Sequence, residues 1–329
     1  MNKLIMGLDG GGTKSHLTLF RMDGTFKAAF SCGNLNHENM AGSFAQLESE
    51  LPSFLHNSLK DSGACIGDVA YAVIGLAGVD NTGQHRIVSD ILTRAGLDRF
   101  TLCNDAYLGV SAGCKESVGI CAINGTGSTM AAIDRTGALQ QVCGIGNLSN
   151  DCGGGWWYAF AALGAVYGEL FKSEPKTALS QILFDIIGIS KKEDYFETIT
   201  AKYAAGTIDY AALNRSVFVA ASMGDNSAIK ILEQSAGHYA GGIAYLISEM
   251  DFGETVNVTL AGSIFVKEKV DILPKLIESK VREKLGLRPV VFGKLDVPPV
   301  AGAVFWAAKE AGVVLDRALV RAALLNAGL

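Results

Sequence analysis

Two glycine-rich stretches carry the residues best suited to chemistry. Residues 7–16 read GLDGGGTKSH and residues 123–130 read INGTGSTM, so each combines glycines with hydroxyl groups. Glycine lets the backbone turn with positive φ and approach a ligand closely, as loops that hold phosphate require. A P-loop is excluded in the first stretch, because Thr13 stands where its lysine belongs and Lys14 comes one residue late. The strand-like residues that flank both stretches predict β-hairpin bends instead.

Asp105 is the single residue on which a catalytic interpretation depends most. It ends a strand-like segment and opens a helical one, at the edge where α/β sheets place their ligands. A carboxylate there can orient a hydroxyl group and accept its proton. Aspartate is also a favoured helix N-cap, and the neighbouring Asn104 can cap equally well. The residues alone leave both interpretations of Asp105 open.

The composition limits the class of protein. The chain has 329 residues, 49% of them apolar and 19% charged, which predicts a globular protein of two domains. Its net charge of −5 offers no basic surface for nucleic acid, and its uncharged runs are too short to cross a bilayer. We therefore expect neither a nucleic-acid nor a membrane partner. None of the seven cysteines belongs to a C-x-x-C motif, which indicates reduced thiols and a cytoplasmic location. The sequence leaves open whether the protein forms a homodimer.

The second glycine stretch repeats the pattern of the first. In each, a strand, a glycine turn, a second strand, a polar turn and a third strand follow in order. Such a repeat indicates two domains that open with the same hairpin. Strands are also expected over 69–76, 100–103 and 256–260. Helices are expected over 41–60 with a bend at Pro52, over 84–95 and from 106 onward. Further helices are expected through most of 153–250, over 264–285 and over 298–329.

Seven motifs in order resemble those of the BadF/BadG/BcrA/BcrD ATPase family. They are LDGGGTKS (8–15), GLAGVD (75–80), CNDAYLGV (103–110), NGTGSTM (124–130), GIGNLSND (144–151), LAGSIF (260–265) and PPVAGAVFWA (298–307). Within the family they are most similar to the N-acetylglucosamine kinases. The resemblance covers essentially the whole chain and implies an α/β fold of two duplicated ribonuclease-H-like (actin-like ATPase) domains, with ATP in the cleft between them.

The resemblance implies a nucleotide site formed by both glycine turns. The residues that would bind ATP are Gly10, Gly11, Gly12, Thr13, Lys14, Gly125, Thr126, Gly127, Gly262 and Ser263. Asp9 would hold Mg²⁺, through water because this ion dehydrates reluctantly. In the matching kinase motif the counterpart of Asp105 contacts the acceptor hydroxyl, which favours a catalytic base over a helix cap.

The substrate implied by the resemblance is an amino sugar or a related hexose. Its binding residues would be Asn36, Asp105, Gly144, Ile145, Gly146 and Asp151. Around Asp151 this chain reads NDCGG where the kinases usually read GDEGS, so the sugar and the hydroxyl that is phosphorylated stay open. Trp156 and Trp157 could stack on a sugar ring, but their apolar helical context predicts core positions.

Domain boundaries and rival functions complete the expectations. Residues 1–115 would form the domain on the sugar side, completed by helices in 299–329, and residues 116–298 the domain on the nucleotide side. Two alternatives to a sugar kinase are an ATPase that activates a CoA-dependent dehydratase or reductase and a non-catalytic module that senses sugar or ATP. The activator needs cysteines for an iron–sulfur cluster, and the isolated cysteines of this chain do not favour it.

Overall fold

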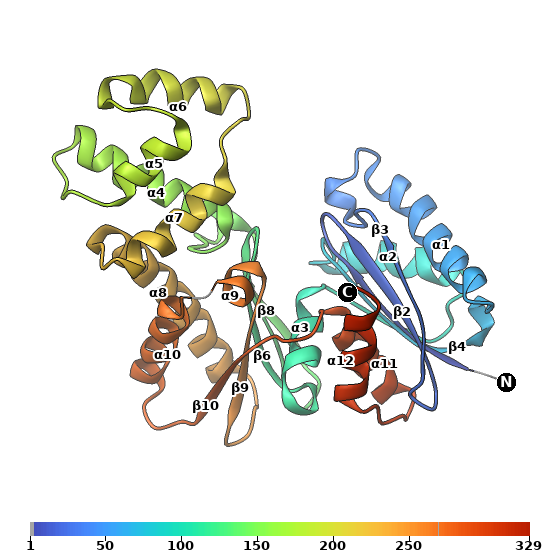
Figure 1. Cartoon of the computed structure of the whole chain (residues 1–329). Helices are drawn as coiled ribbons and strands as arrows, with labels where there is room; N and C mark the ends of the chain where they lie inside the picture. The colour runs from blue at the N-terminus through green and yellow to red at the C-terminus, as the bar shows by residue number, and fades with distance from the viewer. Residues whose placement is uncertain (1–2, 269) are drawn as a thin grey trace.

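Two five-stranded sheets with the same strand order organise the computed structural model, which describes residues 3–268 and 270–329 (Figure 1). The first sheet has the order β3-β2-β1-β4-β5 and the second the order β8-β7-β6-β9-β10. The strands of the first are Leu4–Gly10 (β1), Ser15–Arg21 (β2), Phe26–Cys32 (β3), Val69–Leu76 (β4) and Phe100–Cys103 (β5). Those of the second are Gly119–Asn124 (β6), Ser128–Ile133 (β7), Leu139–Cys143 (β8), Val256–Ala261 (β9) and Val290–Lys294 (β10).

The internal repeat expected from the glycine stretches is confirmed and extends over all five strands. The first three strands of each sheet are antiparallel neighbours, whereas the fourth and fifth run parallel to the first. The hairpins close where the pattern predicted, at the pairs Gly10–Ser15 and Asn124–Ser128. The expected α/β fold of two duplicated units is therefore correct, although strand β10 had not been predicted.

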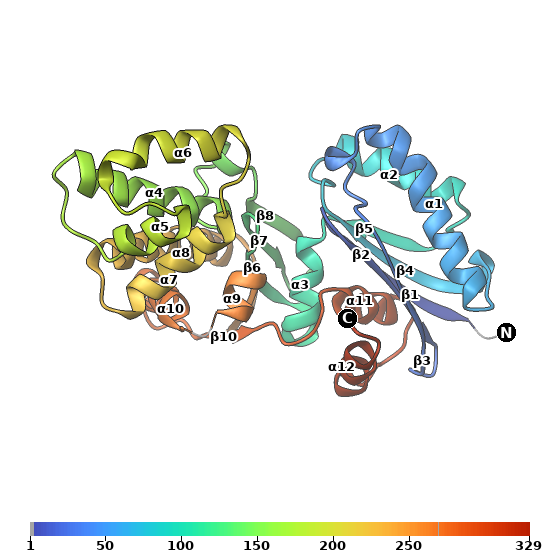
Figure 2. The same ribbon diagram turned by 45° about the horizontal axis from the view of Figure 1, so that its top comes forward.

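Helices cover both faces of the first sheet (Figure 2). The sheet with α1 (Ser43–Asp61) and α2 (Thr82–Arg94) on one face and α11 (Val300–Glu310) and α12 (Arg317–Asn326) on the other is called the N-terminal lobe below. Strand β1 is buried on both sides: Leu4, Met6 and Leu8 pack toward α1 and α2, and Ile5 packs toward α11. Its almost continuous apolar sequence is what a strand buried on both faces requires.

A bundle of helices covers one face of the second sheet, and this assembly is called the C-terminal lobe. Its helices are α4 (Gly155–Phe171), α5 (Leu179–Ile187), α6 (Tyr195–Ala204), α7 (Tyr210–Ser222), α8 (Asn226–Glu249), α9 (Ser263–Lys267) and α10 (Ile272–Leu285). Helix α3 (Ala106–Gly113) packs on the other face and lies between the two lobes in Figures 1 and 2. It is apolar all round because it contacts α11 on one side and β6 and β7 on the other.

Two expected helices are broken in the structure. The expected helix over 264–285 is divided into α9 and α10, and the one over 298–329 is divided into α11 and α12. In the second case Gly312 has a φ of 72°, so the chain leaves the helical region there. Helix α1 continues through Pro52. The domain boundaries proposed above stay predictions. Within the described residues, no helix has the length and apolar character needed to cross a membrane.

Candidate active site

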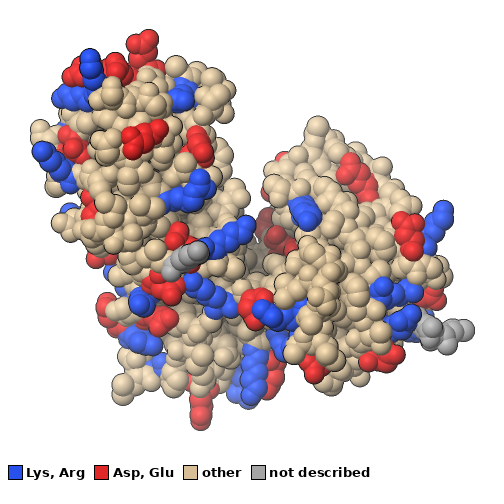
Figure 3. Space-filling model, viewed as in Figure 1, with Lys and Arg blue, Asp and Glu red and all other residues tan. Residues whose placement is uncertain are grey.

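The two glycine turns face one cavity between the lobes. It has a volume of about 410 Å³ and takes residues from both turns, from the end of β5 and from the end of β8. They include Gly12, Thr13, Asn36, Asp105, Gly125, Thr126, Gly127 and Gly144. Figure 3 shows the surface hollowed between the lobes, with acidic side chains in its depth. The structure thus brings together residues that lie more than a hundred positions apart in the sequence.

Each turn presents two backbone N–H groups that the turn itself does not use. Gly11 N–H donates to Lys14 O at 3.2 Å, and Gly125 N–H donates to Gly127 O at 3.0 Å. Within residues 3–268 and 270–329, the N–H groups of Gly12 and Thr13 in the first turn and of Thr126 and Gly127 in the second have no acceptor. Unpaired N–H groups on opposite walls form an anion-binding arrangement.

The carboxylate of Asp105 makes no capping hydrogen bond to the helix it precedes, although the nearby N–H groups of Ala106 and Asp105 favour its charged form. Asn104 Oδ1 accepts the N–H of Ala106 at 2.8 Å. Asn104 also donates through Nδ2 to Asp80 Oδ1 at 2.7 Å. The cap function that the sequence left open therefore belongs to Asn104, and the Asp105 carboxylate lines the cavity.

A second carboxylate, Asp9 at the end of β1, lies near Asp105. Burial, and secondly the Asp105 carboxylate, raise the pKa of Asp9 from 3.8 to about 7. Burial, and secondly Asp80, raise the pKa of Asp105 to about 6. Acids held close together in a partly desolvated site are unfavourable unless a cation or a proton compensates them.

The donor set at this site fits Mg²⁺ and a polyphosphate. Mg²⁺ prefers oxygen ligands, and Asp9 offers a carboxylate that the structure leaves electrostatically uncompensated. A Cβ built on Gly125 or Gly127 would meet no atom within 4 Å, so the second turn is open toward the cavity. These two turns and Asp9 are the residues that would hold the nucleotide and its metal ion.

Several residues that the resemblance implies for nucleotide and metal do not line this cavity: Asp9, Gly10, Gly11, Lys14, Gly262 and Ser263. Gly10 lies inside the sheet, where a Cβ would overlap Leu76, so packing explains that glycine. Lys14 is exposed and does not line the cavity. Gly262 has a φ of 89° and packs against the backbone of Asn124, which places Gly262 and Ser263 directly behind the second turn. Whether these residues bind nucleotide stays a prediction.

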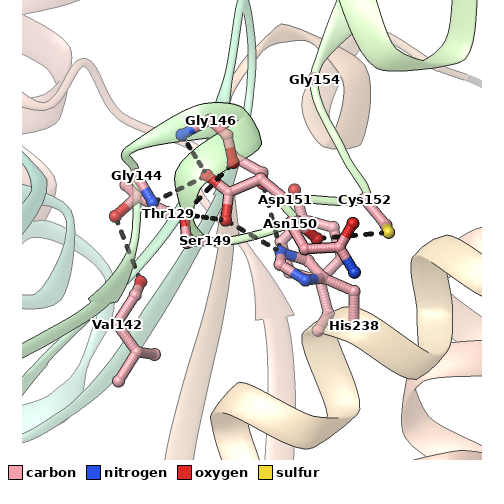
Figure 4. Close-up of polar contacts among 12 residues, drawn as sticks. Thr129, Val142, Gly144, Gly146, Ser149, Asn150, Asp151, Cys152, Gly154 and His238 are labelled. Carbon is pink, nitrogen blue, oxygen red and sulfur yellow. Dashed lines mark hydrogen bonds and ion pairs between the residues drawn. The ribbon is translucent and has the colours of Figure 1, made fainter.

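The proposed sugar residues divide between this cavity and a neighbouring one. Asn36 and Gly144 line the first, whereas Gly146 and Asp151 line a second cavity of about 620 Å³. Gly144, Thr126, Gly127 and Ser128 border both. Asp151 Oδ2 accepts N–H groups from Gly144 at 3.0 Å and from Gly146 at 2.9 Å, and this closes the bend (Figure 4). Ile145 points its apolar side chain toward solvent, 60% exposed.

Comparison with known proteins decides the family. A sequence profile of the BadF/BadG/BcrA/BcrD ATPase family matches residues 6–307. The chain belongs to this family. A curated relative, the N-acetylmuramic acid/N-acetylglucosamine kinase of Clostridium acetobutylicum, is 26% identical over 266 residues, which is 80% of this chain and 85% of the relative.

Solved structures agree with the fold. A candidate N-acetylglucosamine kinase from Chromobacterium violaceum superposes with a TM-score of 0.67 at 22% identity, over 93% of this chain and 99% of the other. A ROK family glucokinase from Streptomyces griseus, solved with glucose and AMPPNP, gives a TM-score of 0.54 at 16% identity, over 94% of this chain and 99% of the other. At these identities the likeness establishes the fold that this BadF/BadG/BcrA/BcrD member shares with them.

Sequence reasoning missed several polar residues of the site. They are Glu38, Asp80, Thr129 and Gln141, all of which line the first cavity. The sequence does contain a signal for Asp80, because this residue is the last of the GLAGVD motif. Thr129 and Gln141 had none, because both belong to ordinary strand segments, β7 and β8.

The expectation that both tryptophans belong to the core is wrong for Trp156. Its side chain is 50% exposed, lies 4.1 Å from the ring centroid of Tyr210 and lines the second cavity with Trp157 and Phe160. The N-terminus of α4 is the reason, since its first turn faces the cavity and not the bundle. Trp157 is half-buried and packs against the C-terminal core.

Proposed function

We propose that this member of the BadF/BadG/BcrA/BcrD family is an ATP- and Mg²⁺-dependent sugar kinase whose acceptor is an amino sugar or a related hexose. The observation that carries the proposal is the Asp105 carboxylate, which makes no capping hydrogen bond, in a cavity bounded by two glycine turns with unpaired N–H groups. Phosphoryl transfer needs a positioned acceptor, charge neutralisation and a group that accepts the hydroxyl proton. The residues that line the cavity, together with the Asp9 carboxylate near Asp105, offer groups for each need.

Each residue has a separate task in this proposal. The N–H groups of Gly12 and Thr13 on one side, and of Thr126 and Gly127 on the other, hold the phosphates. Asp9 binds the magnesium ion, which supplies charge neutralisation on the phosphates. Asp105 accepts the proton of the sugar hydroxyl as that oxygen attacks the terminal phosphorus of ATP, whose bond to the bridging oxygen breaks so that ADP leaves. The raised pKa of Asp105 makes it a better base than an exposed aspartate.

The acceptor class follows from the polar groups beside Asp105. Asn36 uses Oδ1 to accept Glu38 N–H at 2.9 Å, which leaves its amide Nδ2 as a donor toward the cavity. Asp80, Gln141 and Thr129 add further hydrogen-bonding groups of the kind that hydroxyls and an N-acetyl group require. The names of the curated relatives, kinases of N-acetylmuramic acid and N-acetylglucosamine, support this class.

The two rival functions have less support. An iron–sulfur activator needs exposed cysteines near a subunit interface, but Cys103, Cys114, Cys121 and Cys152 are buried and Cys65 alone is exposed. A sensing module would not need an Asp105 carboxylate that makes no capping hydrogen bond. A cytoplasmic location and a homodimer stay predictions.

An ADP-release assay tests the proposal. The purified protein is incubated with MgATP and, in turn, N-acetylglucosamine, N-acetylmannosamine, glucosamine, N-acetylmuramic acid and glucose. The proposal predicts that at least one sugar stimulates ADP release and that the product is a sugar phosphate. ADP release that no sugar stimulates would favour the ATPase activator, and ATP binding without turnover would favour the sensing module.

A further inference from the structure

Three potential metal ligands from distant parts of the chain converge beside the second cavity. They are Cys143 at the end of β8, Asp151 in the bend that follows, and His238 on α8. One ligand atom from each lies within 4.8 Å of those of the other two. Figure 4 shows the Asp151 carboxylate and the His238 ring turned toward each other. The proposed kinase chemistry gives Cys143 and His238 no role.

The backbone holds these side chains in place. Cys143 has a φ of 64°, a left-handed conformation that a residue with a Cβ rarely adopts and that costs free energy. The Asp151 carboxylate is fixed through Oδ2 by the N–H groups of Gly144 and Gly146. The side chains of His238 and Asp151 are only 11% and 5% exposed. Asp151 and His238 are therefore held in place before any ligand arrives, and the strained backbone fixes the position of the Cys143 Cβ.

The distance between Asp151 and His238 leaves room for an ion. Asp151 Oδ1 and His238 Nε2 are 3.9 Å apart, too far for a hydrogen bond. Tetrahedral zinc with bonds of about 2.0–2.3 Å places its ligand atoms roughly 3.3–3.6 Å from one another. The ligand atoms now lie within 4.8 Å of one another, so they would move closer around an ion. His238 Nε2 and Asp151 Oδ1 would then exchange their hydrogen bonds with Ser128 Oγ (3.3 Å) and Ser149 Oγ (2.7 Å) for the metal.

We propose that Cys143, Asp151 and His238 bind one Zn²⁺ ion, with water or another small ligand in the fourth position. Thiolate, imidazole and carboxylate together match the preference of zinc, whereas Mg²⁺ requires oxygen ligands in octahedral geometry. The second oxygen of Asp151, Oδ2, accepts hydrogen bonds from two backbone N–H groups. Hydrogen bonds of this kind, made by the atom of a ligand that does not bind the metal, orient metal ligands in proteins. The ion would clamp the bend of residues 144–151 to α8.

Metal binding is tested on the tag-free full-length protein without reference to kinase activity. The protein is treated with a chelator, dialysed and titrated with Co²⁺, then with Zn²⁺. The proposal predicts one equivalent of Co²⁺ with a thiolate charge-transfer band and the intense visible bands of a tetrahedral site, both removed by Zn²⁺. X-ray absorption of the zinc-loaded wild type should show one sulfur at about 2.3 Å and nitrogen or oxygen in the other positions.

Substitutions identify the ligands. Cys143→Ser should abolish the charge-transfer band, and His238→Ala should lower the Zn²⁺ affinity at least about tenfold. Cys65→Ser, at an exposed cysteine, and Cys152→Ser, whose Sγ already contacts Gln234 Nε2 at 3.6 Å, should leave both unchanged. Absence of the band or of the sulfur distance in the wild type would overturn the proposal, as would an unchanged band in Cys143→Ser. The wild-type spectra decide the question even where a variant fails to fold.

Discussion

Asn104 caps helix α3 and so frees Asp105, the next residue, from that task. The N–H of Ala106 donates to Asn104 Oδ1 at 2.8 Å, and Asn104 Nδ2 donates to Asp80 Oδ1 at 2.7 Å. The side chain that stabilises the helix and the side chain proposed for chemistry are therefore adjacent but distinct. Stability and turnover can be separated by substituting one or the other.

Removal of the Asn104 cap should lower the stability of the protein and leave the proposed base, Asp105, in place. Asn104→Ala should lower the free energy of unfolding by about 0.5–2 kcal/mol, because the Ala106 N–H loses its acceptor. Denaturant unfolding of the wild type, Asn104→Ala and Asp105→Ala measures this, because alanine cannot cap a helix. A loss of stability in Asp105→Ala as large as in Asn104→Ala would assign the cap to Asp105 instead.

The acid Asp9 should make the metal-free protein less stable as pH rises. Its folded pKa of about 7 lies above the unfolded value of 3.8, so the stabilising protonated form is fully present below pH 3.8 and is lost as pH rises through 7. Asp9→Asn removes this effect. Relative to the wild type, the variant should therefore gain about 1–3 kcal/mol between pH 4.5 and 7.5.

Thermal or denaturant unfolding of both proteins over this pH range is the measurement. Comparing the variant with the wild type cancels the contribution of the other carboxyl groups. Mg²⁺ should reduce the difference, since a bound cation compensates the Asp9 charge. A difference that does not change with pH would show that Asp9 is not protonated in the folded protein.

The pH dependence of turnover should report Asp105. A base must be deprotonated, and burial raises the pKa of Asp105 to about 6, so kcat/KM for the sugar should fall as pH decreases through 6. Steady-state kinetics between pH 5 and 8 measure it, with ATP saturating. An acid limb centred near 4 would contradict the desolvated environment assigned to this carboxylate.

A side chain added to the second glycine turn should weaken ATP binding, because it would fill space in the cavity. Gly127 has room for a Cβ, so Gly127→Val should fold, but its methyl groups would occupy the place of a phosphate and raise the KM for ATP at least about tenfold. Gly293→Val, at another strand-edge glycine with open space around it, is the control. Equal KM values for ATP in the two variants would show that the second turn is a structural hairpin and does not bind ATP.

Much of the fold was predictable because the glycine turns interrupt strands in a repeated pattern. The hairpins on either side of Gly12 and Gly127 come from period-two alternation and turn residues, both of which are local. Strand β10 was missed because VVFGK is short and lies at the sheet edge, where the burial signal is weak. The break between α9 and α10 could not be predicted, because no glycine or proline turn motif stands between residues 267 and 272.

The candidate site was only partly predictable, for a different reason. Asp9, Thr13 and Asp105 could be found because each follows a strand or lies in a glycine turn. Thr129 and Gln141 could not, because each lies in an ordinary strand and only the packing of the two lobes brings it to the cavity. The cap assignment also needed the structure, since Asn104 and Asp105 are equally good caps by residue type.

Replacement of Asp105 by asparagine tests the central claim most directly. Asp105→Asn keeps the shape and the hydrogen-bonding capacity of the side chain but cannot accept a proton, and general-base assistance is worth about 10²–10⁴ in rate. With the best sugar found, kcat should fall by that factor while calorimetry shows sugar and ATP affinity changed only modestly. Asp98→Asn, at an exposed acid, should leave kcat unchanged. A folded Asp105→Asn protein with kcat within a few-fold of the wild type would contradict the assignment of Asp105 as the base.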